Sequence, residues 1–249
     1  MTTAAAPSFS SLLPRIAAAI ALTCGVAAYA ADVTGSGQIQ SETRAVSGFQ
    51  AIALKTSVKV VLRQGSREGA ELRADDNVLP LIETQVVDSG GVPTLEIRTR
   101  RGTSYRTRTT PVVTVDLIRL SGITISGSGD VRGEQLKGAN LKVDISGAGD
   151  VRLNKVAVDD VGIKVSGSGD IRLDGRAAKL AVAIAGSGDV NTAELEADDV
   201  SVGISGTGDA TVNARKTLSV SIAGTGSVAY TGDAVPKTSI AGMGTVRRK

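Results

Sequence analysis

A short glycine turn that recurs at a nearly constant interval constrains this sequence more than any other feature. Gly-x-Gly begins at Gly127, Gly147, Gly167, Gly186, Gly206, Gly224 and Gly242, at steps of 20, 20, 19, 20, 18 and 18 residues, and Asp follows in the first five copies. One Gly-x-Gly would carry little information. Seven copies in register indicate a repeat protein in which each copy is one structural unit.

Apolar residues alternate with polar residues on both sides of these turns. The triplets that precede successive turns are Leu141, Val143, Ile145; Val161, Ile163, Val165; Leu180, Val182, Ile184; Val200, Val202, Ile204; and Leu218, Val220, Ile222. A period of two with β-branched residues is typical of strands. A hairpin array would show two unlike strands and alternating turns, whereas each unit here has one long strand and the same turn. We therefore predict an all-β fold, a single-stranded right-handed parallel β-helix with coils of about 20 residues.

The glycines of the five aspartate-bearing turns are expected to form the corners of the coils. They are Gly127, Gly129, Gly147, Gly149, Gly167, Gly169, Gly186, Gly188, Gly206 and Gly208. Glycine is expected at these corners for two physical reasons. A tight corner demands positive φ, which glycine adopts without a Cβ clash, and each corner residue lies against its copies in neighbouring coils, where side chains would crowd.

Residues 31–120 lack the strict period but still contain strand patterns. Apolar residues alternate at Val58, Val60 and Leu62, and again at Val113, Val115 and Leu117. We interpret residues 31–120 as irregular early coils or a β cap, continuous with the regular repeats of residues 121–249. No Pro/Ser-rich linker separates the two parts, so residues 31–249 are predicted to form one domain.

The first thirty residues have the pattern of a secretory signal peptide. Arg15 ends a basic region, residues 16–26 are apolar, and Ala28-Tyr29-Ala30 is a small-x-small cleavage pattern. Cleavage is expected after Ala30; lipidation of Cys24 is the rival interpretation, although Thr23 fits a lipobox poorly. The mature chain would then have no cysteine and no membrane-spanning segment. We expect secretion across the inner membrane, to the periplasm or the cell surface.

A resemblance to a known family rests on motifs in both halves of the chain. Gly48-Phe49-Gln50-Ala51-Ile52 leads to Val58-Lys59-Val60, and Ala74-Asp75-Asp76-Asn77-Val78-Leu79-Pro80 precedes a Leu95-Glu96-Ile97 strand. With the Ser-Gly-Ser-Gly-Asp repeats, these motifs resemble the bacterial DUF2807 family, the "putative auto-transporter adhesin head GIN domain". The resemblance covers nearly all of the mature chain. It implies a secreted or periplasmic parallel β-helix, related to the toast-rack modules of envelope-stress systems.

The repeated aspartates are candidate metal ligands. They are Asp130, Asp150, Asp170, Asp189 and Asp209. Calcium-binding β-rolls also place aspartate on glycine turns, but they use a nine-residue repeat, whereas here an ion would need ligands from adjacent coils. The simpler interpretation is that each carboxylate accepts backbone N–H groups at its own turn. Arg132, Arg152 and Arg172 follow the first three aspartates by two residues and are expected to offset their mutual repulsion.

The densest basic cluster is a candidate binding site. It comprises Arg98, Arg100, Arg101, Tyr105, Arg106 and Arg108. Anionic envelope polymers or lipid headgroups could dock on such a cluster, although charged loops are commonly only solvated. A net charge of +3 without a concentrated basic face excludes a nucleic-acid binder.

Composition argues against an enzyme. The sequence has no histidine and 2% aromatic residues, so a serine triad is excluded and platforms for sugar rings are scarce. We predict a non-enzymatic envelope protein without a cofactor, an adhesin or partner-binding module for an envelope protein or polymer. The alternatives are a periplasmic sensor or scaffold in envelope-stress signalling and, less favoured, a polysaccharide-active β-helix enzyme. The oligomeric state is left open.

Overall fold

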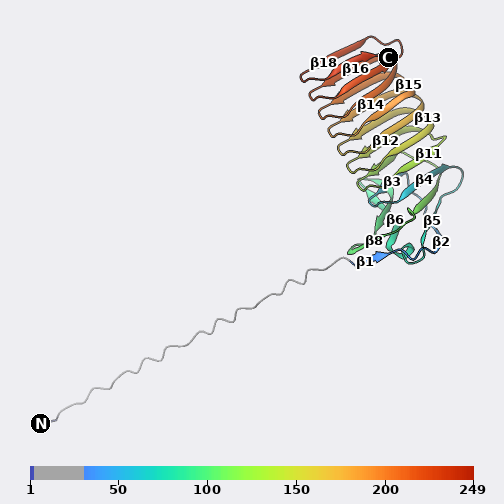
Figure 1. The fold of residues 1–249 in the computed structure, drawn as a ribbon, viewed down its shortest axis with the longest axis vertical. Coiled ribbons are helices and arrows are strands. Elements are labelled where there is room, and N and C mark those ends of the chain that lie inside the picture. The colour runs from blue at the N-terminus through green and yellow to red at the C-terminus, as the bar shows by residue number, and fades with distance from the viewer. Residues whose placement is uncertain (3–30) are drawn as a thin grey trace.

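The computed structural model describes residues 1–2 and 31–249, so the signal segment and Cys24 lie outside the described residues. The described chain is almost entirely β-structure; its one helical element is the 3-10 helix η1 (Leu79–Leu81). Parallel coils of about 20 residues stack into a β-solenoid of about six turns (Figure 1). The predicted fold class is confirmed. Within the described residues no helix is long and apolar enough to cross a membrane.

The regular coils stack in the order of the sequence. Their strands are β12 (Lys137–Ile145), β13 (Val151–Val165), β14 (Ile171–Ile184), β15 (Val190–Ile204) and β16 (Ala210–Ile222), and each pairs in parallel with the next. The last strands are β17 (Ser227–Thr231), β18 (Pro236–Ile240) and β19 (Thr245–Arg248). The short strand expected after each turn is continuous with the long strand of its coil in β13 to β16.

Three sides of each coil enclose one core. In β13 the buried residues fall into three groups: Val151 and Leu153, then Val156 and Val158, then Val161, Ile163 and Val165. We call the side of residues 151–153 and its stacked equivalents the turn-following face, and the side of residues 161–165 the groove face. Register keeps each position in line through the stack, since Leu141, Val161, Leu180, Val200 and Leu218 are direct neighbours. Each such buried aliphatic side chain contributes about 1.5–3 kcal/mol.

The lowest coils do not follow sequence order. β10 (Gly122–Ile125) rests on β3 (Ala51–Leu54), which rests in turn on β7 (Val92–Thr99). In the same way β11 (Val131–Glu134) rests on β4 (Lys59–Gln64), and β4 on β9 (Val112–Leu117). The coil formed by residues 51–64 is therefore held between two segments that come later in the chain.

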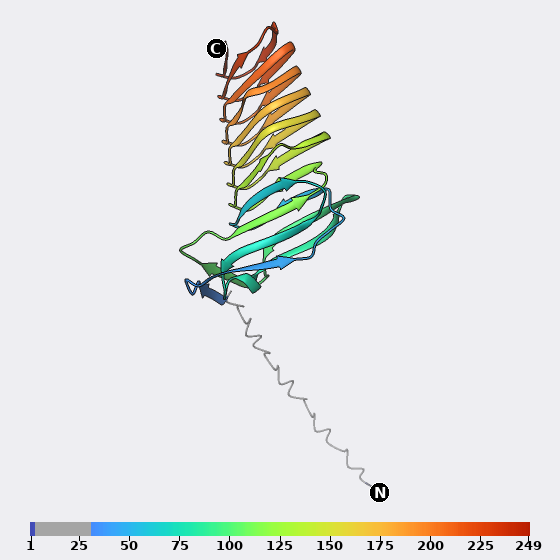
Figure 2. The same cartoon turned by 90° about the vertical axis from the view of Figure 1, so that its right-hand side faces the viewer.

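Antiparallel strands close the N-terminal end of the stack. β6 (Ile82–Ser89) pairs with β7, while β5 (Gly69–Asp75) pairs with both β9 and β2 (Ile39–Arg44). The small parallel pair of β1 (Ala31–Thr34) and β8 (Thr103–Arg106) lies beside them. Figure 2 shows these strands beneath the regular coils. Residues 31–120 thus contain both irregular coils and a β cap.

The positive-φ explanation for the corner glycines is wrong. Among the described residues, glycines with positive φ lie at other positions, such as Gly175 at φ 127°. The corner glycines are required by close stacking instead, because a Cβ atom built on Gly149 or Gly169 would overlap the carbonyl oxygen of the glycine one coil below. Positive φ occurs at a different corner of the coil, at Gln135 (57°), Lys155 (53°) and Gly175.

Candidate functional site

The aspartates of the turns form a ladder of hydrogen bonds between coils. The Oδ1 atom of Asp150 accepts the backbone N–H of Asp170 at 3.0 Å, and Oδ1 of Asp170 accepts that of Asp189 at 2.9 Å. Asp130, Asp189 and Asp209 do the same for the next coil, at 3.3, 2.8 and 2.7 Å. The expectation that each carboxylate binds its own turn is wrong, since the donor belongs to the following coil. These side chains join the corners.

Hydroxyl side chains continue the ladder beyond the last aspartate. Ser227 still donates its N–H to Asp209, and its hydroxyl lies 3.1 Å from that of Thr245, so hydroxyl groups replace carboxylates in the last two coils. In the part of the chain that the structure describes, no group of three or more acidic, Cys or His side chains is arranged to hold a metal ion. The five aspartates therefore lie in a line, one per coil, and not around a common centre.

The arginines that follow the aspartates do not pair with them. Arg132, Arg152 and Arg172 lie in register on adjacent strands, with their side chains exposed. Each of the salt bridges found within residues 31–249 involves other residues. These arginines therefore form no salt bridge with the aspartates, and the expected offset of carboxylate repulsion across the same face stays a prediction.

The predicted basic cluster is divided among acidic partners. Arg98 and Arg100 both contact Glu83, at 3.0 and 3.3 Å, and Arg106 lies 3.2 Å from Asp32. The hydrogen bond from Arg98, helped by Arg100, holds the pKa of Glu83 below its usual 4.5.

The remaining members of the cluster do not restore a basic surface. Tyr105 is half-buried, and its hydroxyl lies 3.4 Å from that of Thr56. Arg101 and Arg108 are exposed and stay outside these ion pairs. The structure therefore does not bring the six residues together as one cationic surface.

The Asp75-Asp76-Asn77 motif secures the segment that leads into β2. Asp75 is buried and accepts the N–H of Gly37 at 3.0 Å and the hydroxyl of Thr107. Asn77 accepts the N–H of Ser36 at 3.0 Å and donates to the carbonyl of Thr34 at 2.8 Å. The side chains of this turn therefore bind segments that are distant in the sequence: Gly37, Ser36 and Thr34 lie about forty residues earlier, and Thr107 lies 32 residues later.

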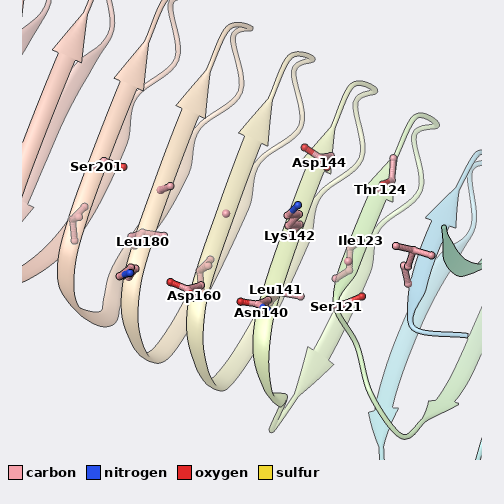
Figure 3. Close-up of a pocket in the computed structure, with 18 of the residues that line it drawn as sticks. Ser121, Ile123, Thr124, Asn140, Leu141, Lys142, Asp144, Asp160, Leu180 and Ser201 are labelled. Atoms are coloured by element: carbon pink, nitrogen blue, oxygen red, sulfur yellow. The ribbon is translucent and has the colours of Figure 1, made fainter. Parts of the chain in front are cut away.

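A long groove runs along the outside of the groove face. It has a volume of about 850 Å³ and crosses β3, β10 and β12 to β16. Its floor consists mainly of small side chains in register, which are Ala51, Gly122, Gly162, Ala181, Ser201 and Ser219, with Lys142 between them. Figure 3 shows the lining residues of successive strands lying in rows along the stack.

One side of the groove is a row of polar residues at the start of the same strands. The row is Asn140, Asp160, Lys179, Asp199 and Thr217. Asp199 accepts the hydroxyl of Thr217 at 2.7 Å. Ser89, Val92 and Thr94 of the β6–β7 hairpin line the groove at the capped end.

Sequence reasoning missed the groove. The available signal was that residues between the buried ones of each triplet, such as Gly162, Ala181 and Ser201, are small in successive repeats. Such positions point outward on a strand, so small residues there leave a surface that side chains do not fill. Asp160 lies on the wall of this groove.

Solved structures share this architecture. An adhesin-like protein from Bacteroides fragilis, described as a putative adhesin, is 26% identical, with a TM-score of 0.80, over 87% of this chain and 100% of that chain. A putative adhesin from Parabacteroides merdae is 21% identical, with a TM-score of 0.71, over 88% of this chain and 100% of that chain. A putative lipid binding protein from Parabacteroides distasonis is 22% identical, with a TM-score of 0.69, over 88% of this chain and 99% of that chain. At those identities the likeness shows the fold alone.

The family assignment comes from the sequence of the solenoid itself. No curated protein matches the chain. The family model described as "Putative auto-transporter adhesin, head GIN domain" matches residues 48–234, from the first coil strand to the last regular coil. This range contains the glycine corners, the aspartate ladder and the groove. The chain therefore belongs to the DUF2807 family, which this model describes.

Proposed function

We propose that the protein is an adhesin-type binding module that holds an extended polysaccharide chain along the groove face. The observation that carries the proposal is the continuous groove across seven parallel strands. At a strand spacing of about 4.8 Å, six steps give a length of about 29 Å. A groove of this length, open to solvent along one side, suits a linear polymer better than a compact small molecule.

The chemistry of the groove favours hydroxyl-rich chains. Its floor lets a chain lie close to the sheet, and the row of Asn140, Asp160, Lys179, Asp199 and Thr217 offers donors and acceptors at one step per coil. Amide, carboxylate and ammonium groups bind hydroxyls as acceptor or donor. Because the solenoid backbone is fixed by its hydrogen-bond ladder, little conformational freedom would be lost on binding.

Family membership supports the same general role. The family and two of the similar solved structures are described as putative adhesins, and an adhesin role would require the export that we expect for this chain. Binding through a repeated row is weak at each step and gains strength from several contacts made together. We therefore expect affinity to increase with the length of the glycan until the groove is filled.

The test is a glycan-binding measurement with the mature chain and one variant that fills the groove. Ser201→Trp places a large side chain on the floor, whereas Thr211→Trp, on the turn-following face of the next coil, is the matched control. We expect at least tenfold weaker binding for Ser201→Trp and an unchanged affinity for Thr211→Trp, with equal melting temperatures. The ligands are neutral glycans, and equal affinity of both variants, or no binding to any neutral glycan, would overturn the proposal.

A further inference from the structure

We infer that the turn-following face carries a second site, a cationic strip for an acidic polysaccharide with carboxylate or sulfate groups. The strip is formed by Arg132, Arg152 and Arg172, which are in register on β11, β13 and β14. It lies around the glycine corner from the groove face. The inference does not rest on the function proposed for the groove.

Geometry places the three guanidinium groups in one line. Direct register partners on neighbouring parallel strands are about 4.8 Å apart, so the strip presents one cation per coil along the axis of the solenoid. The line is bounded by the uncharged residues Val61 on β4 and Asn191 on β15, which occupy the same register position. It can therefore contact two or three successive acidic groups of a chain.

A hollow at the lower end of the strip provides room for a ligand. It has a volume of about 480 Å³, and its lining includes Lys59, Arg63, Arg132, Gly133, Glu134 and Arg152. Gly133 lies directly between Leu62 and Leu153 in the register, and the leucine side chains around it occupy the space that a side chain at this position would take. Four of the side chains around the hollow are cationic and one is anionic.

The charges of the strip are left available within the described chain. Of the four cations around the hollow, Arg63 pairs with Asp116 at 3.0 Å, whereas Lys59, Arg132 and Arg152 enter none of the salt bridges or side-chain hydrogen bonds found in residues 31–249. The nearby carboxylates of Asp130 and Asp150 each have Oδ1 engaged by a backbone N–H. Their position beside the arginines favours a ligand that carries hydroxyl groups as well as acidic groups.

The guanidinium groups of the strip favour a ligand that carries carboxylates or other oxyanions. Arginine presents a planar fork of N–H donors that matches carboxylate and other oxyanions in a bidentate manner. Three like charges in one line also repel each other, and a polyanion that lies across them relieves this repulsion. A linear acidic polysaccharide meets both requirements, since it repeats an anionic group at sugar-residue intervals.

The experiment measures binding of the mature chain to polygalacturonate, which carries carboxylates, and to dextran sulfate, with neutral dextran as the reference. The test variant is Arg132→Gln/Arg152→Gln/Arg172→Gln. The matched control, Arg73→Gln/Arg119→Gln/Arg176→Gln, removes the same charge from exposed arginines outside both the strip and the basic cluster. We expect the wild type to bind one of the polyanions at least tenfold more tightly than neutral dextran. The strip variant should lose at least tenfold in affinity and the control less than threefold.

Two further measurements separate this site from a general charge effect and from the groove. Replacing the three strip arginines by lysine should give intermediate affinity, because charge is kept and the fork is lost. Ser201→Trp in the groove should leave polyanion binding unchanged, so that the two proposals fail independently. Absence of polyanion binding, or equal losses in the strip and control variants at equal melting temperature, would overturn the inference.

Discussion

The regular coils and residues 31–120, which we call the base, bury similar aliphatic residues. Their strands are connected in different ways. From β12 to β16 each strand pairs with its successor, so neighbours in space are about one repeat apart in sequence. In the base, β3 lies between β7 and β10, and antiparallel strands pass beneath the parallel stack. One region is built by repetition, and the other by contacts between distant segments.

The difference shows what ends a solenoid. A repeated coil always leaves an unsatisfied edge and an uncovered core, and stacked repeats therefore need caps. The base supplies such a cap at one end, with Leu72, Ile82 and Leu95 fully buried. At the other end of the described chain Ile240 is 45% exposed and Met243 82% exposed. Regularity stabilises the middle of the molecule, and irregularity closes the base.

The largest effect is expected from Gly169→Val in the regular region. Because a Cβ atom here would overlap the carbonyl oxygen of Gly149, the two corners must separate, and we expect a loss of about 3 kcal/mol or more in the free energy of unfolding. Gly162→Ala is the control, since its Cβ would meet nothing nearer than 3.9 Å. A second comparison at the same corner separates crowding from positive φ.

If crowding is the requirement, Gly169→Asn should lower the free energy of unfolding at least as much as Gly169→Ala. Asn adopts positive φ more readily than Ala, so clearly better tolerance of Asn in chemical denaturation would make positive φ the requirement instead.

A smaller loss is expected from Asp75→Ala in the base. The variant leaves the N–H of Gly37 and the hydroxyl of Thr107 without their buried acceptor, at a cost of about 2 kcal/mol. Hydrogen exchange should accelerate around residues 34–38 while the amides of β14 and β15 stay protected. Uniform acceleration in all coils would show that base and regular coils unfold as one unit.

The aspartate ladder distinguishes a hydrogen-bonding role from a metal-binding role. Asp170→Asn keeps an oxygen that can accept the N–H of Asp189 and should change stability little, whereas Asp170→Ala should cost about 1 kcal/mol. Thermal melting of the wild type in millimolar calcium and in chelator should coincide. A calcium-dependent rise that disappears in Asp170→Asn would instead assign the ladder to an ion.

The smallest effect concerns pH and compares one carboxyl group from each region. Arg98 lowers the pKa of Glu83 in the base below 4.5, and the hydrogen bond from Lys216 lowers that of Asp198 in the regular coils below 3.8. A lowered folded-state pKa means that each group stabilises the protein above its ordinary pKa, and that this is lost as pH falls through the lower value. Glu83→Gln and Asp198→Asn should each make acid unfolding slightly less steep, as followed by circular dichroism. A steeper profile would contradict the assigned sign.

The repeat could be predicted from the sequence because its information is local. A turn, an alternating triplet and a period of about twenty residues determine β12 to β16, their register and their inward-facing residues. The order of the lower coils could not be predicted, because nothing in residues 51–64 indicates that residues 92–117 will lie on one side and residues 122–134 on the other. Backbone angles were also beyond the pattern, so crowding and positive φ could not be separated at the corner glycines.

The candidate sites show the same limit. The charges of Arg98, Arg100 and Arg106 are visible in the sequence, but their partners depend on strand pairing: Glu83 faces Arg98 across the β6–β7 hairpin, and Asp32 comes from the distant strand β1. The groove depends on small outward residues, which carry no chemical motif of their own. The density of charged residues in a sequence segment was therefore a poor predictor of a binding site. The size of the residues at outward-facing strand positions would have been a better one.

The interleaved coil of residues 51–64 has a consequence for the order of events during folding. Its strands are synthesised before either of their neighbours in the stack, so they must wait until residues 92–134 have emerged before both sides are paired. Closing these long loops is the slow step expected of contacts that are distant in sequence. Once β10 and β11 are seated, each later coil meets a finished template, and the remainder of the chain can add to it one repeat at a time as it is made.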